Sequence, residues 1–169
     1  MPSDIPDLVA HHPLLAGLPG DAVDRVAGCA RNVAAHAGEL VLAEGEAADT
    51  LYLLRRGRVT IEVHVPGHGA LVIETLGPGA VIGWSWLIPP YRWQFDARAS
   101  EPTGVIAVDA VCLRDKAEAD PRLGYELMKR FASTMVERLQ ATQLRLVDLY
   151  GTSGPRRAGA AVGEAATAE

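Results

Sequence analysis

The middle of this chain is a series of short apolar segments separated by turn residues. In the clearest segment, residues 58–65, alternate side chains project to one face of an expected strand, namely Val59, Ile61, Val63 and Val65. Similar segments occur at 39–43, 50–54, 70–76, 80–82, 96–100 and 104–108. Gly and Pro turns such as 66–69 and 77–79 connect several of them. Short strands at near-regular spacing predict a mainly β fold, either a barrel or a sandwich.

Helical patterns flank this β region. Residues 5–35 are expected to be helical in pieces, with breaks at Pro13 and Pro19, and Asp21 is a candidate N-cap. Asp109 is a candidate N-cap for a short helix that ends near residue 116 or 118. The flanking helices complete a fold that is mainly β with helices at both ends.

A long helix is expected over residues 121–150, because Asp120 is a good N-cap and Pro121 suits the first helical position. Its apolar stripe begins at Leu123 and Leu127 and ends in heptad spacing. We expect the first half to pack on its own domain and the second half to form a parallel two-helix dimer. The alternative is that the whole stripe packs on its own domain. The expected dimer seam comprises Phe131, Met135, Leu139, Thr142, Leu146 and Leu149.

The size and composition fit one domain over residues 1–150, followed by a disordered tail over 151–169 that is rich in Ala, Gly and Glu. A net charge of −5 argues against a nucleic-acid binder. We see neither a signal peptide nor a membrane span. Cys29 and Cys112 lack the spacing of a zinc site, so we expect a cytoplasmic protein with reduced thiols.

Residues 83–99 hold all three tryptophans of the chain, together with Tyr91 and Phe95. Aromatic side chains supply a large contact area at low entropy cost, so the segment is a candidate pocket or interaction surface. The alternative is that these rings simply belong to the core. Against it, Pro89 and Pro90 are more typical of a surface loop than of a core strand.

The sequence shows few of the residue patterns that are typical of an enzyme active site. The five histidines are scattered, and none lies beside a nucleophile or carboxylate at a useful spacing. A phosphate-binding P-loop and the G-x-S-x-G motif are both missing. We therefore expect a protein without catalytic residues, a metal or a cofactor.

Several motifs together resemble the cyclic nucleotide-binding domain of the Crp/Fnr superfamily, which includes bacterial catabolite activators. The resemblance covers about residues 10–150. It implies a β jelly roll (a double-stranded β-helix) with N-terminal helices and a long C-terminal dimerisation helix. The motifs are the opening His12–Leu18, Gly38-Glu39, Glu44-Gly45-Glu46, Asp49–Val59 and Glu137–Thr142.

In that family, a phosphate-binding cassette contains G-E-h-[AGS]-L, a loop, and R-[ST]-A-x-h-x-A. The short cassette helix offers backbone N–H groups to the phosphate, the glutamate binds the ribose and the arginine binds the phosphate. Here Gly83 and Leu87 match, but Trp84 takes the glutamate position and Trp93 the arginine position. Gln94 and Phe95 replace the next two residues. The resemblance thus implies a degenerate cassette that does not bind cyclic nucleotides in the usual way.

Other groups remain candidates for a ligand. Ser85 and the backbone near Gly83 could still bind an anion. Arg92 is one position from the arginine slot and would face away on a regular strand, although a bulged loop could restore it and permit cAMP binding. The ligand-pocket candidates are Gly83, Trp84, Ser85, Trp86, Leu87, Arg92, Trp93, Gln94 and Arg98, with Arg138, Thr142 and Gln143 at positions where the family's long helix contacts the base.

Three interpretations of the aromatic segment stay open. In the first, the indoles fill the pocket and leave a ligand-free dimerisation or adaptor domain. In the second, they line a pocket for a flatter and more apolar effector. In the third, they anchor a protein partner. Many relatives carry a helix-turn-helix after the long helix. Residues 151–169 lack the apolar periodicity that two further helices require, so we expect a stand-alone module that regulates through a partner without direct DNA or membrane binding.

Overall fold

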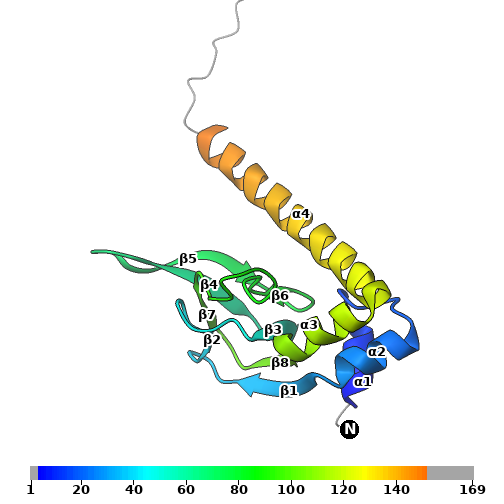
Figure 1. Ribbon diagram of the computed structural model, residues 1–169. Coiled ribbons are helices and arrows are strands. Elements are labelled where there is room, and N and C mark those ends of the chain that lie inside the picture. The colour runs from blue at the N-terminus through cyan, green and yellow to red at the C-terminus, as the bar shows by residue number, and fades with distance from the viewer. Residues whose placement is uncertain (1–3, 152–169) are drawn as a thin grey trace, which may run out of the picture. The chain divides into compact units, whose positions relative to one another are not determined.

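The structure is a computed structural model that describes residues 4–151 (Figure 1). The chain divides between residues 132 and 133 into two compact units. The first unit contains all the strands and the first turns of the last helix. The described part of the second unit is the rest of that helix. Most of the predicted tail, from residue 152 onward, lies outside the described residues.

Two antiparallel four-stranded sheets make up the β region of the described residues, as the family resemblance implies. In the first sheet the strand order is β1 (Ala30–Ala35), β8 (Thr103–Asp109), β3 (Thr50–Arg56) and β6 (Val81–Ile82). In the second sheet the order is β2 (Leu40–Leu42), β7 (Asp96–Ala99), β4 (Val59–Val65) and β5 (Gly69–Leu76). The prediction of a mainly β fold with flanking helices is confirmed.

The helices flank the sheets at both ends of the chain. They are α1 (Ile5–His11), α2 (Gly20–Ala27), α3 (Ala110–Ala119) and α4 (Pro121–Gly151). The two predicted acidic caps at the C-terminal side are confirmed. Asp109 accepts from the backbone N–H of Cys112 at 2.8 Å, and Asp120 accepts from those of Arg122 and Leu123 at 3.1 and 3.4 Å.

The N-terminal prediction was wrong in two places. Residues 30–35 were expected to be helical, but they form β1, which pairs along its whole length with β8. The segment has no strong apolar alternation of its own, so this pairing with a buried strand decides its conformation. Asp21 is not an N-cap, since α2 begins at Gly20 and Pro19 takes the cap position.

Strand β4 departs from the predicted alternation at Glu62, opposite a bulge in β5. The register against β5 shifts between Ile61 and Glu62, and both of these side chains are buried. Val63 is only half-buried. The buried Glu62 carboxylate is paired with Arg98, whose Nε lies 3.2 Å from Oε2.

The prediction of reduced cysteines was also wrong, because Cys29 and Cys112 form a disulfide with a Cα–Cα separation of 5.9 Å. The pairing of β1 with β8 brings them together. Ala30 lies opposite Val108, so Cys29 precedes β1 at the point where the chain leaves β8 and enters α3. The two residues are 83 positions apart, and nothing local in the sequence signals their contact.

One buried core connects these elements within the first unit. It takes apolar side chains from both sheets, from α1 and α2, and from α3 and the start of α4. The predicted packing of the first half of α4 is confirmed by the burial of Leu123 and Leu127. No helix within residues 4–151 has the length and apolar character needed to cross a membrane.

Candidate functional site

The aromatic segment forms a loop over residues 83–95, between β6 and β7, here called the aromatic loop. Its indoles do not all point to solvent. Trp86 is 2% exposed and Trp93 is 5% exposed, whereas Trp84 is half-buried. Phe95 and Ile88 are exposed. The loop therefore has a buried aromatic side and an exposed rim, which argues against an interpretation in which all three indoles face a protein partner.

Trp93, which the family resemblance predicts at the position of the phosphate-binding arginine, packs directly over Gly83. A Cβ atom at Gly83 would lie 2.4 Å from Cζ3 of Trp93, and the φ of Gly83 is +78°, so this close contact requires glycine. The indole also lies near Tyr52, with ring centroids 6.3 Å apart. Backbone hydrogen bonds fix it further: the Trp93 N–H donates to the Glu46 carbonyl and the Gly45 N–H to the Trp93 carbonyl.

The other two indoles contact the start of α4 through Phe131. Ring centroids lie 6.0 Å apart for Trp84 and 5.0 Å apart for Trp86, both with edge-to-face geometry. Phe131 is only 1% exposed. Its placement in the expected dimer seam is therefore corrected, because its ring is used inside its own domain to hold the aromatic loop.

Arg114 on α3 fastens the same loop, and sequence reasoning missed it. Its Nη1 donates to the Trp86 carbonyl, and its guanidinium carbon lies 4.3 Å above the centroid of the Tyr91 ring. Tyr91 is in the left-handed region, with φ of 53°, so the chain makes a tight bend there. An isolated arginine on a short helix carries no local sign of such a role, so no sequence signal could have found it.

The expected cassette helix is reduced to turns. Residues 84–90 form successive turns and bends, and the Leu87 N–H donates to the Trp84 carbonyl at 3.0 Å. The backbone near Gly83 and Ser85 therefore forms turns in place of a helix N-terminus, and its role as an anion site stays a prediction.

The basic and amide groups considered for ligand recognition have other partners. Nη1 of Arg92 donates to the Gly45 carbonyl at 2.8 Å. Nη1 of Arg98 donates to the Gly38 carbonyl at 2.8 Å, in addition to the ion pair with Glu62. Gln94 is exposed and donates to the Arg92 carbonyl at 3.1 Å. The structure does not bring these three side chains together with the buried indoles.

A small apolar cavity of about 50 Å³ lies where the loop meets α3 and the start of α4. Nε1 of Trp86 is buried and has no hydrogen-bond acceptor within the described part of the chain. A cavity of this size holds a water or a small polar group. The lining residues are Trp86, Leu87, Leu113, Arg114, Ala117, Gly124, Leu127, Met128 and Phe131.

The candidates on the long helix lie in the second unit. Arg138 is half-buried, whereas Thr142 and Gln143 are exposed, and the Thr142 hydroxyl donates to the Arg138 carbonyl at 2.9 Å. Their role toward a ligand stays a prediction. Among residues 4–151, the structure has no group of three or more His, Cys, Asp or Glu side chains placed to hold a metal ion.

A second cavity, of about 330 Å³, lies beside α1 and is lined by both neighbouring histidines, His11 and His12. His12 is buried, and its Nδ1 accepts from the Leu14 N–H at 3.3 Å. Burial lowers the pKa of His12 to about 4, and the backbone of Leu54 opposes this shift. The side chain is therefore a neutral structural group near pH 7.

Comparison with known proteins finds a matching family model and similar solved structures. The family model of the cyclic nucleotide-binding domain matches residues 33–120, which contain seven of the eight strands in full and the aromatic loop. Among curated proteins, the chain is 27% identical over 120 residues to a CRP-like cAMP-activated global transcriptional regulator of Mycobacterium tuberculosis. The match covers 71% of this chain and 52% of the relative, so the chain spans about half the length of that relative.

Solved structures show the same fold. A proposed cyclic nucleotide-binding protein from Geobacter metallireducens superposes with a TM-score of 0.71 at 28% identity, over 79% of this chain and 97% of the other. The catabolite activator protein of Thermus thermophilus superposes with a TM-score of 0.64 at 24% identity, over 82% of this chain and 63% of the other.

Proposed function

This chain belongs to the cyclic nucleotide-binding domain family, and from that premise we propose that it is a regulatory module whose nucleotide cassette has been rebuilt with aromatic side chains. In this proposal the module does not bind cAMP or cGMP in the family's usual way. It acts without enzymatic activity, as an effector-sensing or adaptor domain. The relatives that match it are regulators, which supports the coarser part of the proposal.

The observation that carries the proposal is the burial of Trp93. The family resemblance puts this residue at the phosphate arginine, and its indole packs against Gly83 in the core. A phosphate would have to displace a buried ring and would find no guanidinium there. Trp84 likewise offers no acceptor at the position of the ribose glutamate.

The expected loss of affinity is large. Hydrogen bonds to charged groups contribute about 1.5–3 kcal/mol each. Losing both side-chain contacts therefore costs about 3–6 kcal/mol, or about two to four decades in the dissociation constant. Arg92 does not offset this loss in the described conformation, since its guanidinium is bonded to the Gly45 carbonyl.

Isothermal titration calorimetry with cAMP and cGMP tests the proposal. We expect no binding tighter than the high-micromolar range, and a low-micromolar or tighter constant would overturn the proposal. The double variant Trp84→Glu, Trp93→Arg restores both family side chains. Binding that appears only in this variant would assign the loss to the two indoles.

The competing proposal is a cAMP-binding regulator with a variant cassette. It is favoured by the M. tuberculosis relative, which is described as cAMP-activated. A third possibility is a different effector, which would require the aromatic loop to open, because the cavity beside Trp86 is only about 50 Å³. Native mass spectrometry of freshly purified protein separates these cases, because a bound nucleotide or another ligand adds its own mass.

The proposal also includes a homodimer through α4. Leu139 is 57% exposed and Leu149 is 69% exposed, and Met135 and Leu146 are exposed as well. Contiguous apolar side chains on one long helix are costly in water and are typical of an association surface. The revised seam therefore begins at Met135, because Phe131 is buried.

A further inference from the structure

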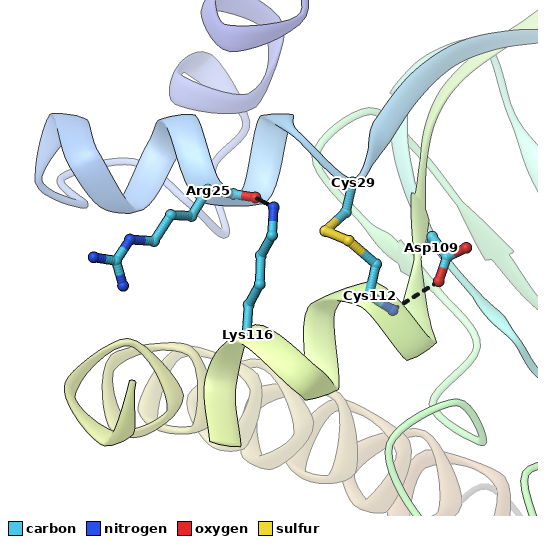
Figure 2. The surroundings of a disulfide bond; sticks show 5 residues. All are labelled: Arg25, Cys29, Asp109, Cys112 and Lys116. Atoms are coloured by element: carbon cyan, nitrogen blue, oxygen red, sulfur yellow. Dashed lines mark hydrogen bonds between the residues drawn. A yellow bond between two sulfur atoms is a disulfide. The ribbon is translucent and has the colours of Figure 1, made fainter. Parts of the chain in front are cut away.

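The Cys29–Cys112 disulfide joins two parts of the first unit that meet only through the fold. Cys29 lies between α2 and β1, and Cys112 lies in the first turn of α3 (Figure 2). Cys29 is buried, whereas Cys112 is half-buried. An attacking thiol therefore reaches the sulfur of Cys112 more readily than that of Cys29.

Cys112 lies in the capped first turn of α3. Its backbone N–H donates to the Asp109 carboxylate at 2.8 Å (Figure 2). Lys116 lies one turn further along the same helix, and its Nζ donates to the Arg25 carbonyl at 2.7 Å (Figure 2). The disulfide and the Lys116 contact therefore hold α3 to the same short stretch of the chain.

Helix α3 also reaches the aromatic loop. Arg114 follows Cys112 by two residues, and its guanidinium holds the Trp86 carbonyl and covers the ring of Tyr91. The disulfide thus ties the first turn of α3 to the residue pair between α2 and β1. Arg114, just after this turn, hydrogen-bonds to the aromatic loop. A shift of the first turn of α3 would move the guanidinium relative to the loop.

We propose that Cys29 and Cys112 form a reversible thiol–disulfide site which a dithiol reductant opens, and that the state of this site is transmitted to the aromatic loop through Arg114. The proposal goes beyond the regulatory function above. It depends on the conformation of the loop and holds whichever ligand the loop binds.

The exchange proceeds in two steps that balance. A thiolate of the reductant attacks Sγ of Cys112, the protein S–S bond breaks, and Cys29 leaves as a thiolate that takes up a proton. The second thiol of the reductant, as its thiolate, then attacks the reductant sulfur in the mixed disulfide, and Cys112 leaves as a thiolate. Two electrons pass to the protein, and the reductant ends as a disulfide.

The three tryptophans, all within the aromatic loop, provide the readout. The folded protein is treated with dithiothreitol without denaturant, and free thiols, tryptophan emission and acrylamide quenching are recorded. We expect reduction to free the thiols of both cysteines, to shift the tryptophan emission to the red and to strengthen its quenching by acrylamide. Reoxidation should reverse each of these three changes. Circular dichroism should stay unchanged.

Two variants isolate the coupling. In Arg114→Gln, both thiols should appear as in the wild type, but the emission should no longer respond to reduction. Arg31→Gln, an exposed substitution on β1, should respond like the wild type. Cys29→Ser with Cys112→Ser should show the reduced emission with and without dithiothreitol. The wild-type and Arg114→Gln measurements are sufficient if this double variant fails to fold.

Each contrary result overturns the proposal. Thiols that stay unreactive until the chain is denatured, or a loss of circular dichroism on reduction, would make the disulfide a structural crosslink only. Reduction without any change in emission would remove the link to the loop. An Arg114→Gln variant that responds like the wild type would remove Arg114 from the link. None of these measurements uses a nucleotide, so a failure here is separate from a failure of the proposed function.

Discussion

At the scale of single residues, the contact between Gly83 and Trp93 shows why the start of the aromatic loop requires glycine. Glycine matches the family's motif at position 83, yet here it also makes room for an indole. Its φ of +78° and the 2.4 Å approach of Trp93 leave no space for a Cβ atom. The packing of the buried Trp93 therefore depends on glycine at position 83.

Substituting Gly83→Ala should therefore destabilise the fold by about 3 kcal/mol, from the positive φ and from displacement of a buried ring. Gly67→Ala is the matched control, since Gly67 has φ of +80° and open space around it. The control should lose only about 1 kcal/mol. Urea unfolding followed by circular dichroism measures both, and equal losses would show that Trp93 does not pack as described.

At the scale of elements, α3 and α4 show what local patterns determine. The acidic caps at Asp109 and Asp120 and the apolar stripe of α4 place both helices correctly, because these signals lie within a few residues of each other. Local patterns do not show where the apolar stripe of α4 changes from buried to exposed positions. Phe131 is buried against two indoles, and the step from buried to exposed positions follows from where the domain surface ends.

The exposed part of α4 leads to the prediction about assembly. Changing Leu139 and Leu146 together to Glu should convert a dimer into a monomer, because like charges would face each other across the seam. Multi-angle light scattering reports the mass.

The matched control changes Leu144 and Val147 to Glu. Both side chains are exposed and apolar but lie off the predicted heptad seam, so this variant should keep the dimer mass. A dimer that survives the seam substitutions, or one that dissociates only in the control variant, would contradict the seam.

At the scale of the whole molecule, the buried His12 links stability to pH. Its pKa is about 4 when folded and 6.5 in the unfolded reference, so the unfolded state takes up a proton first as the pH falls. The stabilising contribution is complete above pH 6.5 and disappears as the pH falls toward 4. The shift corresponds to about 3 kcal/mol.

Replacement of His12 by Asn keeps an acceptor for the Leu14 N–H and removes the titration. Urea unfolding at pH 7.5, 5.5 and 4.5 should show a smaller loss of stability for His12→Asn than for the wild type. His68→Asn, in the exposed β4–β5 turn, should behave like the wild type. A His12→Asn variant with the wild-type pH dependence would rule out His12 as the titrating group.

The sequence by itself determined the strands with apolar alternation, the capped starts of α3 and α4, and the family, because those signals are local or lie in motifs. It also assigns Trp84 and Trp93 to two ligand-binding positions of the family, which stays a prediction. Only the tertiary structure decided that residues 30–35 form a strand, that Cys29 meets Cys112, and that Phe131 and Arg114 hold the aromatic loop. Each of these depends on a contact between segments far apart in the chain, and no periodicity or cap encodes such a contact.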